Sequence, residues 1–449
     1  MIAAFIMLTS LIALMPALVM VDGILANGVV SAIVAIAILT VVLTLDTSEL
    51  NRFSRLLGPT AFIVLFIPCL WMLLQVLPIS NRSLANPVWV SAVTALDQPF
   101  VGAISLDISA TLLSLAHYCA ILAAAFVTAT VTLDKRCAES VLSLLTAIAA
   151  LIAAELIGYD LGYLRLPGYE HLGERADAMV IAIIGFILSC ATTIRTYEHL
   201  DRTQHRKSRT VAIVAASASM AALVICLSAI LISGDPALFL AALFGAGILI
   251  AVLAIRRWRF GPLGQAGIAA LAAVAVFGFF AVAPANKDAD PTLALSTQIE
   301  RMLSDAKWAG SGAGSFEALL PIYRDTADSL EIPTAAATIA IEMGRPFLWA
   351  CVIAALMGAS TLFRRALLRG RDYVYSSAGA GCIIALLISL FANDGILGLT
   401  PSLMISVVCG LAFAQSKSAS NRDLDLSEKL YSIRNRTNDT PRLRVLDGS

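Results

Sequence analysis

Long apolar runs constrain this chain more than any other feature of its sequence. A helix that crosses a lipid bilayer needs about 20 mostly apolar residues. Inside the bilayer the backbone groups must hydrogen-bond within the segment, so such runs predict helices, and none shows the period-two alternation of barrel strands. We identify twelve candidate spans, at residues 2–21, 24–45, 59–78, 110–133, 141–158, 178–195, 210–232, 236–255, 264–283, 346–363, 376–392 and 398–414.

The composition agrees with a protein that is surrounded mainly by lipid. Only 14% of the residues are charged, whereas an ordinary globular chain is about 25% charged. The formal net charge is zero, so no general attraction to nucleic acid is expected. We therefore expect the lipid bilayer, and no nucleic acid, among the partners of this chain.

Basic residues alternate from one connection to the next. Of the 31 Lys and Arg residues, 23 fall in every second connection and in the C-terminal tail. Since cytoplasmic loops carry the excess of positive charge, both termini are predicted to be cytoplasmic. The expected fold is an all-α, polytopic integral membrane bundle of about 12 helices. One membrane domain covers residues 1–415, and a flexible cytoplasmic tail covers residues 416–449.

The cysteines and histidines indicate neither an outer disulfide framework nor a metal site. All eight cysteines lie in or beside the apolar runs or in the predicted cytoplasmic connections. No Cys/His cluster has the spacing of metal ligands. We expect no metal and no other cofactor.

One long polar stretch, residues 284–345, interrupts the apolar runs between the ninth and tenth spans. Asp290, followed by proline, predicts a helix start, and the apolar residues after it recur at helical spacing. Ser315 is placed to cap a second short helix. Pro333 begins a third helix that ends near Glu342. By the alternation of charge, this helical loop lies on the outer side of the membrane.

Glycines 310, 312 and 314 open the segment 310–316, which we call the glycine turn. Glycines let backbone N–H groups converge, and the following helix start adds partial positive charge. A phosphate or pyrophosphate fits such a turn. A plain linker is the alternative interpretation, because alternating Gly, Ser and Ala are also common in linkers.

Four arginines are notable because basic residues are scarce on the outer side. They are Arg165, Arg175, Arg324 and Arg345. Guanidinium groups bind phosphate with two hydrogen bonds, which suits a pyrophosphate ligand. The alternative is that they anchor the chain at the interface or pair with neighbouring acids.

Several other polar groups have both a functional and a structural interpretation. Glu342 can act as a general base or bond a sugar hydroxyl, and it can equally cap the loop or pair with Arg345. His117 and Glu155 lie within predicted spans, where ionisable groups are functional candidates; a hydrogen bond between helices is the alternative for each. Asp394 lies in a turn between the last two spans.

The motifs of the outer loops, taken together, resemble those of one family. The long loop holds a Gly-x-Gly-x-Gly-x-Phe run, a later Tyr and a Glu-x-Gly pair at the start of a helix, and the middle loop holds Arg-x-x-Gly-Tyr. These residues are Gly310, Gly312, Gly314, Phe316, Tyr323, Glu342, Gly344, Arg165, Gly168 and Tyr169.

With about a dozen helices and a large late loop, the chain resembles the O-antigen ligase and polysaccharide polymerase superfamily. The resemblance implies a protein of the bacterial inner membrane that transfers a glycan from an undecaprenyl-pyrophosphate carrier to an acceptor sugar. The transfer takes place on the periplasmic side without a metal. It further implies catalysis by Glu342 and Arg324, and binding of pyrophosphate or glycan by Arg165, Arg345, Gly310, Gly312, Gly314 and Tyr323.

The chain departs from the family at two places. No histidine occurs in residues 284–345, and Ser233-Gly234-Asp235 lacks the arginine of a Ser-Arg-Gly motif. Two alternative functions follow. One is a non-catalytic membrane protein that works with other polysaccharide-assembly proteins. The other is a glycan or lipid transporter, although the spans hold few of the charges that ion coupling uses.

Overall fold

The structure is a computed structural model, and within the residues that it describes the fold is entirely helical. The expected span 264–283 and nearly all of the expected tail lie outside those residues. The described residues are 2–20, 23–44, 63–79, 85–97, 101–163, 172–200, 206–258, 293–323, 333–368 and 372–416.

Nine helices in the described part of the chain are long and apolar enough to cross a membrane, so the chain is a polytopic helical membrane protein. Two shorter apolar helices, Ile63–Val76 and α15 (Tyr373–Ser389), match two more of the expected runs. The total of twelve stays a prediction. The nine are α1 (Ile2–Val19), α2 (Ile24–Thr44), α5 (Ile108–Val131), α6 (Lys135–Asp160), α7 (Leu172–Leu200), α8 (Arg206–Ser233), α9 (Pro236–Trp258), α14 (Arg345–Leu368) and the last helix, Leu399–Ser416.

Aspartates begin three of the long helices. Asp107 accepts hydrogen bonds from the amides of the first turn of α5, at 2.9 and 3.1 Å. Asp134 and Asp235 do the same for α6 and α9, at 3.2 and 2.8 Å. These carboxylates satisfy amides that have no partner within the helix. Each helix therefore begins at a position that its sequence specifies.

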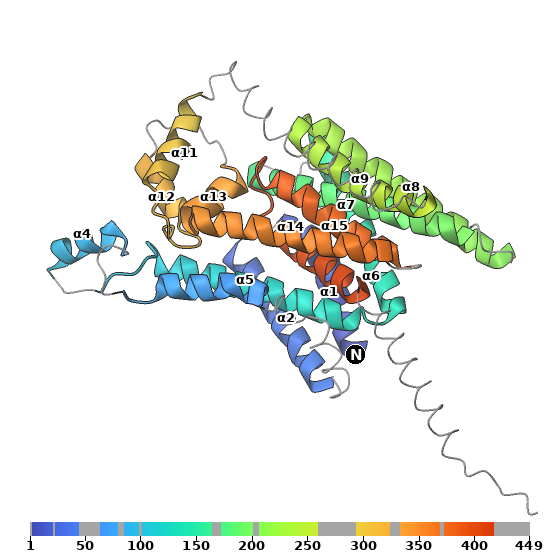
Figure 1. Cartoon of the computed structure of the whole chain (residues 1–449), viewed down its shortest axis with the longest axis horizontal. Coiled ribbons are helices and arrows are strands. Elements are labelled where there is room, and N and C mark those ends of the chain that lie inside the picture. Colours follow the sequence, from blue (N-terminus) through green and yellow to red (C-terminus); the bar gives the residue numbers. More distant parts are fainter. Residues whose placement is uncertain are drawn as a thin grey trace, which may run out of the picture.

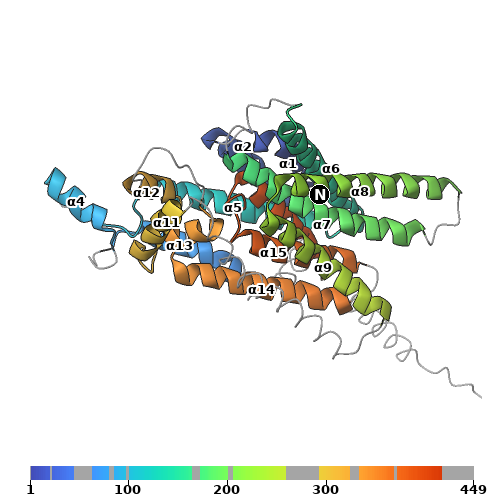
Figure 2. The same cartoon turned by 90° about the horizontal axis from the view of Figure 1, so that it is seen from above.

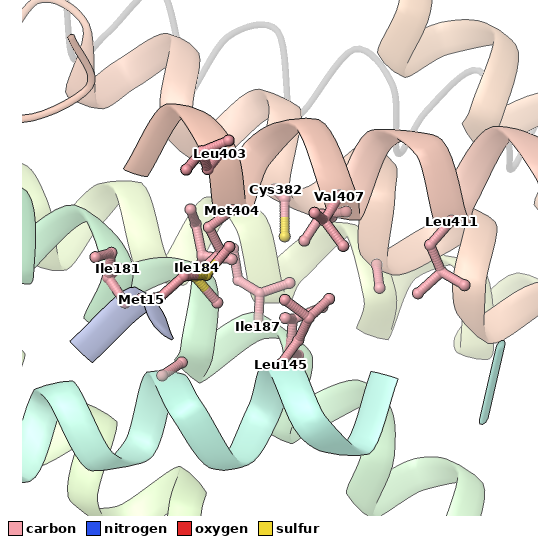
Figure 3. Packing of buried hydrophobic residues seen from close by; sticks show 14 of the residues in the cluster. Met15, Leu145, Ile181, Ile184, Ile187, Cys382, Leu403, Met404, Val407 and Leu411 are labelled. Carbon is pink, nitrogen blue, oxygen red and sulfur yellow. The ribbon is translucent and has the colours of Figure 1, made fainter. Parts of the chain in front are cut away.

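The core lies where α6, α7, α15 and the last helix meet. Ile184 and Ile187 of α7 are completely buried and point toward Leu145 of α6 and Met404 of the last helix (Figure 3). Small residues let the helices approach closely: a Cβ at Gly245 of α9 would lie 2.9 Å from the carbonyl oxygen of a glycine in α15. Such close backbone approach is typical of helix packing in membranes.

The described part of the polar stretch forms three short helices at one end of the bundle, which we call the loop end (Figures 1 and 2). They are α11 (Leu293–Asp305), α12 (Phe316–Tyr323) and α13 (Ala335–Glu342). A further short helix, α4 (Pro87–Leu96), lies at the same end. The expected order of helix, glycine turn and two more helices is confirmed.

Candidate functional site

The glycine turn packs directly against the end of α13. Gly310, Gly312 and Gly314 have φ angles of 78°, 108° and 75°, which side-chain-bearing residues rarely adopt. A Cβ at Gly310 would lie 2.2 Å from the carbonyl oxygen of Glu342. A Cβ at Gly344 would lie 2.1 Å from the carbonyl oxygen of Trp308. Two chain segments thus meet backbone to backbone, which only glycine permits.

Hydrogen bonds join the same two segments. The amide of Ser311 donates to the carbonyl of Ile341, and the amide of Gly312 donates to the carbonyl of Glu342, both at 2.9 Å. The Ser311 hydroxyl also donates to Ile341, at 3.1 Å. The turn is therefore held in one place relative to α13 and to the helix that follows it.

The carboxylate of Glu342 caps α12 from outside that helix. Its Oε1 accepts a hydrogen bond from the amide of Phe316, the first residue of α12, at 3.1 Å, and the Gly314 amide also donates to it. Burial raises the pKa of Glu342 to about 6, although these two hydrogen bonds act in the opposite direction. The loop-capping interpretation of Glu342 is thus observed, and the group remains titratable near neutral pH.

We call the contact between the glycine turn and the end of α13 the junction. Gln75 of helix Ile63–Val76, which was not among the candidates from the sequence, hydrogen-bonds to both sides of it. The side chain is completely buried. Its Nε2 donates to the carbonyls of Ala309 and Glu342, at 3.1 and 3.0 Å, and its Oε1 accepts from the amide of Ala313, at 3.2 Å. An amide inside an apolar run was the signal that could have identified it.

A second residue of the same helix acts with Gln75. The indole nitrogen of Trp71 donates to the carbonyl of Met343, at 3.0 Å. Its ring lies 6.5 Å from the ring of Trp308, a residue that is 62% exposed. Helix Ile63–Val76 therefore contacts the segments on both sides of the junction.

The start of α5 supplies a third contact to the turn. The amide of Leu106 donates to the carbonyl of Ser311, at 2.7 Å. The hydroxyl of Thr111 donates to the carbonyl of Ala313, at 3.0 Å, and lies 2.7 Å from the hydroxyl of Ser105. Ser105 also limits the space at Gly312, where a Cβ would come within 2.4 Å of its Oγ.

The other end of α13 is fixed to the turn between α15 and the last helix. The amides of Ala335 and Ala336 donate to the carbonyls of Asn393 and Leu390, at 3.0 and 2.9 Å. The next residue, Asp394, carries a carboxyl group whose pKa burial raises to about 6. Both ends of α13 thus carry, or adjoin, a carboxyl group that titrates close to neutral pH.

The structure brings some of the predicted site residues together and separates others. Glu342 lies against Gly310, Gly312 and Gly314, as described above. Arg345, three residues after Glu342, is exposed, and its Nη2 donates to the carbonyl of Leu303, at 2.7 Å. The hydroxyl of Tyr323 donates to Asp305, at 3.2 Å. Arg165 and Arg324 lie outside the described residues.

The amides of the glycine turn bond within the protein. Those of residues 311 and 312 donate to carbonyls, and that of Ala313 donates to Gln75. Those of Gly314 and Phe316 donate to the Glu342 carboxylate, so the anion at this turn is a side chain of the same chain. Pyrophosphate binding by the three glycines stays a prediction, and it requires donors other than these amides.

His117 is hydrogen-bonded between three helices, in agreement with its structural interpretation. Its Nδ1 lies 2.9 Å from Oδ1 of Asn27 in α2, and its Nε2 lies 3.3 Å from the Ser402 hydroxyl in the last helix.

Glu155 differs from His117: its Oε2 is buried and has no hydrogen-bond partner among the described residues. Within those residues, no group of three His, Cys, Asp or Glu side chains is placed to hold a metal ion.

No protein-family model matches the chain, and no curated protein matches it.

Proposed function

We propose that the chain is an envelope polysaccharide polymerase or ligase-like protein of the bacterial inner membrane. It transfers a glycan from an undecaprenyl-pyrophosphate carrier to an acceptor sugar, without a metal. The observation that carries the proposal is Glu342, a half-buried carboxyl group with a pKa raised to about 6. A group with such a pKa is ionised at neutral pH and can still accept a proton in a transition state.

The reaction assigned to Glu342 is the activation of the acceptor. The carboxylate takes the proton of an acceptor hydroxyl while the hydroxyl oxygen bonds to the anomeric carbon of the donor glycan. The bond between that carbon and the pyrophosphate oxygen breaks, and undecaprenyl pyrophosphate leaves with the bonding electrons. Because pyrophosphate is a good leaving group, cations that neutralise its charge are sufficient, and a metal is not required.

Two exposed side chains near Glu342 support a charged glycolipid as substrate. The guanidinium of Arg345 uses Nη2 for the Leu303 carbonyl and faces solvent, where it can neutralise phosphate. Trp308 precedes the glycine turn and is largely exposed, and an exposed indole ring offers an apolar surface to a sugar ring. We assign Arg324 to catalysis with Glu342, and Arg165, Tyr323 and the three turn glycines to binding of pyrophosphate or glycan.

The same proposal fixes the orientation of the chain. The loop end faces the periplasm, twelve helices cross the membrane, and both termini lie in the cytoplasm. The support is the distribution of Lys and Arg between alternate connections.

The test compares Glu342→Gln with wild type in a host whose surface glycan depends on this protein. The variant keeps the shape and the acceptor oxygen for the Phe316 amide but cannot accept a proton. We expect glycan chains to be lost or shortened and the release of undecaprenyl pyrophosphate from purified donor to fall at least about 100-fold. In wild type, the same release should rise with pH through about 6, as Glu342 ionises.

Glu300→Gln is the control, because Glu300 is an exposed carboxylate of α11 at the same end of the bundle, to which no role is assigned. It should leave both readouts unchanged, at equal amounts of protein in the membrane. Wild-type glycan length and wild-type release by Glu342→Gln would exclude Glu342 as the base.

A non-catalytic role in polysaccharide assembly is the second candidate. It is favoured by the closed hydrogen bonding of the glycine turn, whose amides bond within the chain. On this alternative, Glu342→Gln restores the glycan in a deletion strain, whereas a variant that displaces the loop, such as Gly344→Val, does not. Release of undecaprenyl pyrophosphate by the purified protein alone would rule it out.

A further inference from the structure

Two cysteines face one another on neighbouring helices that both hold the glycine turn. The sulfur of Cys69, in helix Ile63–Val76, lies 3.8 Å from the sulfur of Cys119, in α5. Both thiols are free; Cys69 is half-buried and Cys119 is exposed. At this distance the two thiols can form a disulfide after only a small movement of their side chains.

We infer that Cys69 and Cys119 form an oxidisable pair, and that their disulfide fastens helix Ile63–Val76 to α5. One S–S bond forms, and each thiol loses one hydrogen. An oxidant that dissolves in the membrane, of the quinone class, takes up the two electrons and two protons and becomes a hydroquinone. A dithiol reductant reverses the step by thiol–disulfide exchange.

The helices are held in the position that the bond requires. A disulfide has an S–S distance of about 2.05 Å, so the sulfurs must approach by somewhat less than 2 Å, a movement that side-chain rotation can provide. The hydroxyl of Tyr118, next to Cys119, donates to the carbonyl of Leu65, at 3.0 Å. Leu65 lies one helical turn before Cys69, so this hydrogen bond keeps the two backbones adjacent beside the thiols.

The disulfide acts on the candidate site through the helix that it fastens. Trp71 and Gln75 follow Cys69 by two and six residues. They donate to the carbonyls of Met343, Ala309 and Glu342. Oxidation therefore immobilises the helix that orients the glycine turn and the backbone of Glu342. This inference does not depend on the proposed reaction.

The experiment uses the full chain in lipid nanodiscs. Copper–phenanthroline in air, which uses oxygen as the final oxidant, is compared with dithiothreitol. After oxidation, digestion and mass spectrometry should give a cross-linked peptide containing Cys69 and Cys119 that is lighter by two hydrogens than its two parts. Maleimide labelling of the denatured chain should find two thiols fewer than the eight of the sequence.

Variants separate this pair from other cysteines. Cys69→Ser and Cys119→Ser should each abolish the cross-linked peptide. Cys226→Ser, which removes a buried thiol of α8, should leave it unchanged. Failure to obtain the Cys69–Cys119 peptide under conditions that oxidise an added reference dithiol would overturn the inference.

Hydrogen exchange tests the effect on the site. Amides 311–316 should exchange about tenfold more slowly in the oxidised chain than in the reduced one, because local opening must now move a tethered helix. Cys69→Ser should show no dependence on oxidant. Equal exchange in the two states, with the disulfide present, would overturn the claim that oxidation immobilises the turn.

Discussion

At the end of the bundle opposite the loop end, charged side chains connect the helices, whereas at the loop end backbone groups do. Lys135 of α6 bonds Asp372, beside α15, at 2.7 Å. Arg195 of α7 pairs with Glu139 of α6 and donates to the hydroxyl of Tyr375 in α15, at 2.6 Å. These are long side chains that can adjust when a neighbour moves.

The loop end has an ion pair as well, between Arg175 and Asp160, but its junction is made differently. Glycine backbones approach carbonyl oxygens there, and one buried amide, that of Gln75, bonds three main-chain groups. Main-chain contacts cannot rearrange without moving the helices that carry them. The stability of the loop end should therefore depend on the size of its side chains, and that of the opposite end on charge and salt concentration.

The largest expected effect comes from adding a single methyl group to the glycine turn. Gly310→Ala places a Cβ 2.2 Å from the Glu342 carbonyl oxygen at a φ of 78°. We expect the free energy of unfolding to fall by about 3 kcal/mol or more, because backbone has to move on both sides. Denaturant unfolding of the purified chain, monitored by circular dichroism, measures this.

Gly234→Ala is the matched control. It has a similar φ of 70°, but nothing lies within 4 Å of the new Cβ. It should cost only about 1 kcal/mol, the strain of a left-handed alanine. If the two variants were equally destabilised, backbone strain alone would explain both, and close packing of the loop end would be disproved.

Removal of the buried amide should have the next largest effect. Gln75→Leu keeps most of the volume but leaves the carbonyls of Ala309 and Glu342 and the amide of Ala313 without this partner. We expect a loss of about 2–4 kcal/mol, the cost of buried polar groups left unpaired. Thermal unfolding measures the loss, and hydrogen exchange should locate it in the glycine turn rather than in α15; uniform acceleration would contradict the assignment.

Protonation of Glu342 should make the stability of the protein depend on pH. The pKa of Glu342 is raised from an ordinary value of 4.5 to about 6, so the folded protein holds this proton more tightly than the unfolded chain does. Its contribution to stability is complete below pH 4.5 and is lost as pH rises through about 6. The stability of wild type relative to Glu342→Gln should therefore fall over this window, on the order of 1 kcal/mol.

The measurement is a series of unfolding curves for both proteins between pH 4 and 8. Glu300→Gln serves again as the control, and its stability should follow that of wild type across this pH range. If the stability of wild type relative to Glu342→Gln rose with pH, the hydrogen bonds from the Gly314 and Phe316 amides would lower the pKa of Glu342 by more than burial raises it.

The smallest effect is expected at the opposite end. Lys135→Met removes the bond to Asp372 from a pair whose side chains are 43% and 31% exposed. Such exposed pairs contribute about 0.2–1 kcal/mol, and the contribution falls with added salt. Unfolding at low and high ionic strength measures both properties. A loss as large as that of Gly310→Ala would remove the contrast between the two ends.

The sequence predicts what depends on local pattern. Runs of apolar residues locate the long helices, because the bilayer fixes both their length and their internal hydrogen bonding. The helical spacing after Asp290 and the glycines at 310, 312 and 314 predict α11 and the turn, since both are local properties. Glu342 is recognised as a candidate base or cap for the same reason.

What the sequence does not predict is which segments meet. The partners of Gln75 lie more than 230 residues later in the chain, and one amide in an apolar run says nothing about their identity. Likewise, Ser315 precedes α12 as a cap should, yet the carboxylate that bonds the first amide of α12 comes from Glu342, 26 residues away. The alternation of basic residues predicts which side of the membrane each connection faces, but it does not predict that Lys135 bonds to Asp372.

The bonds of Gln75 also have a consequence for the time at which the protein is made. A ribosome adds roughly 5–20 residues per second, so Ala309, 234 residues after Gln75, appears about 10–50 s later. During that interval helix Ile63–Val76 is already available for insertion, with a polar amide that lacks these permanent partners. The junction at the loop end is therefore completed late in synthesis, and until then the side-chain amide of Gln75 lacks the main-chain partners that it has in the folded protein.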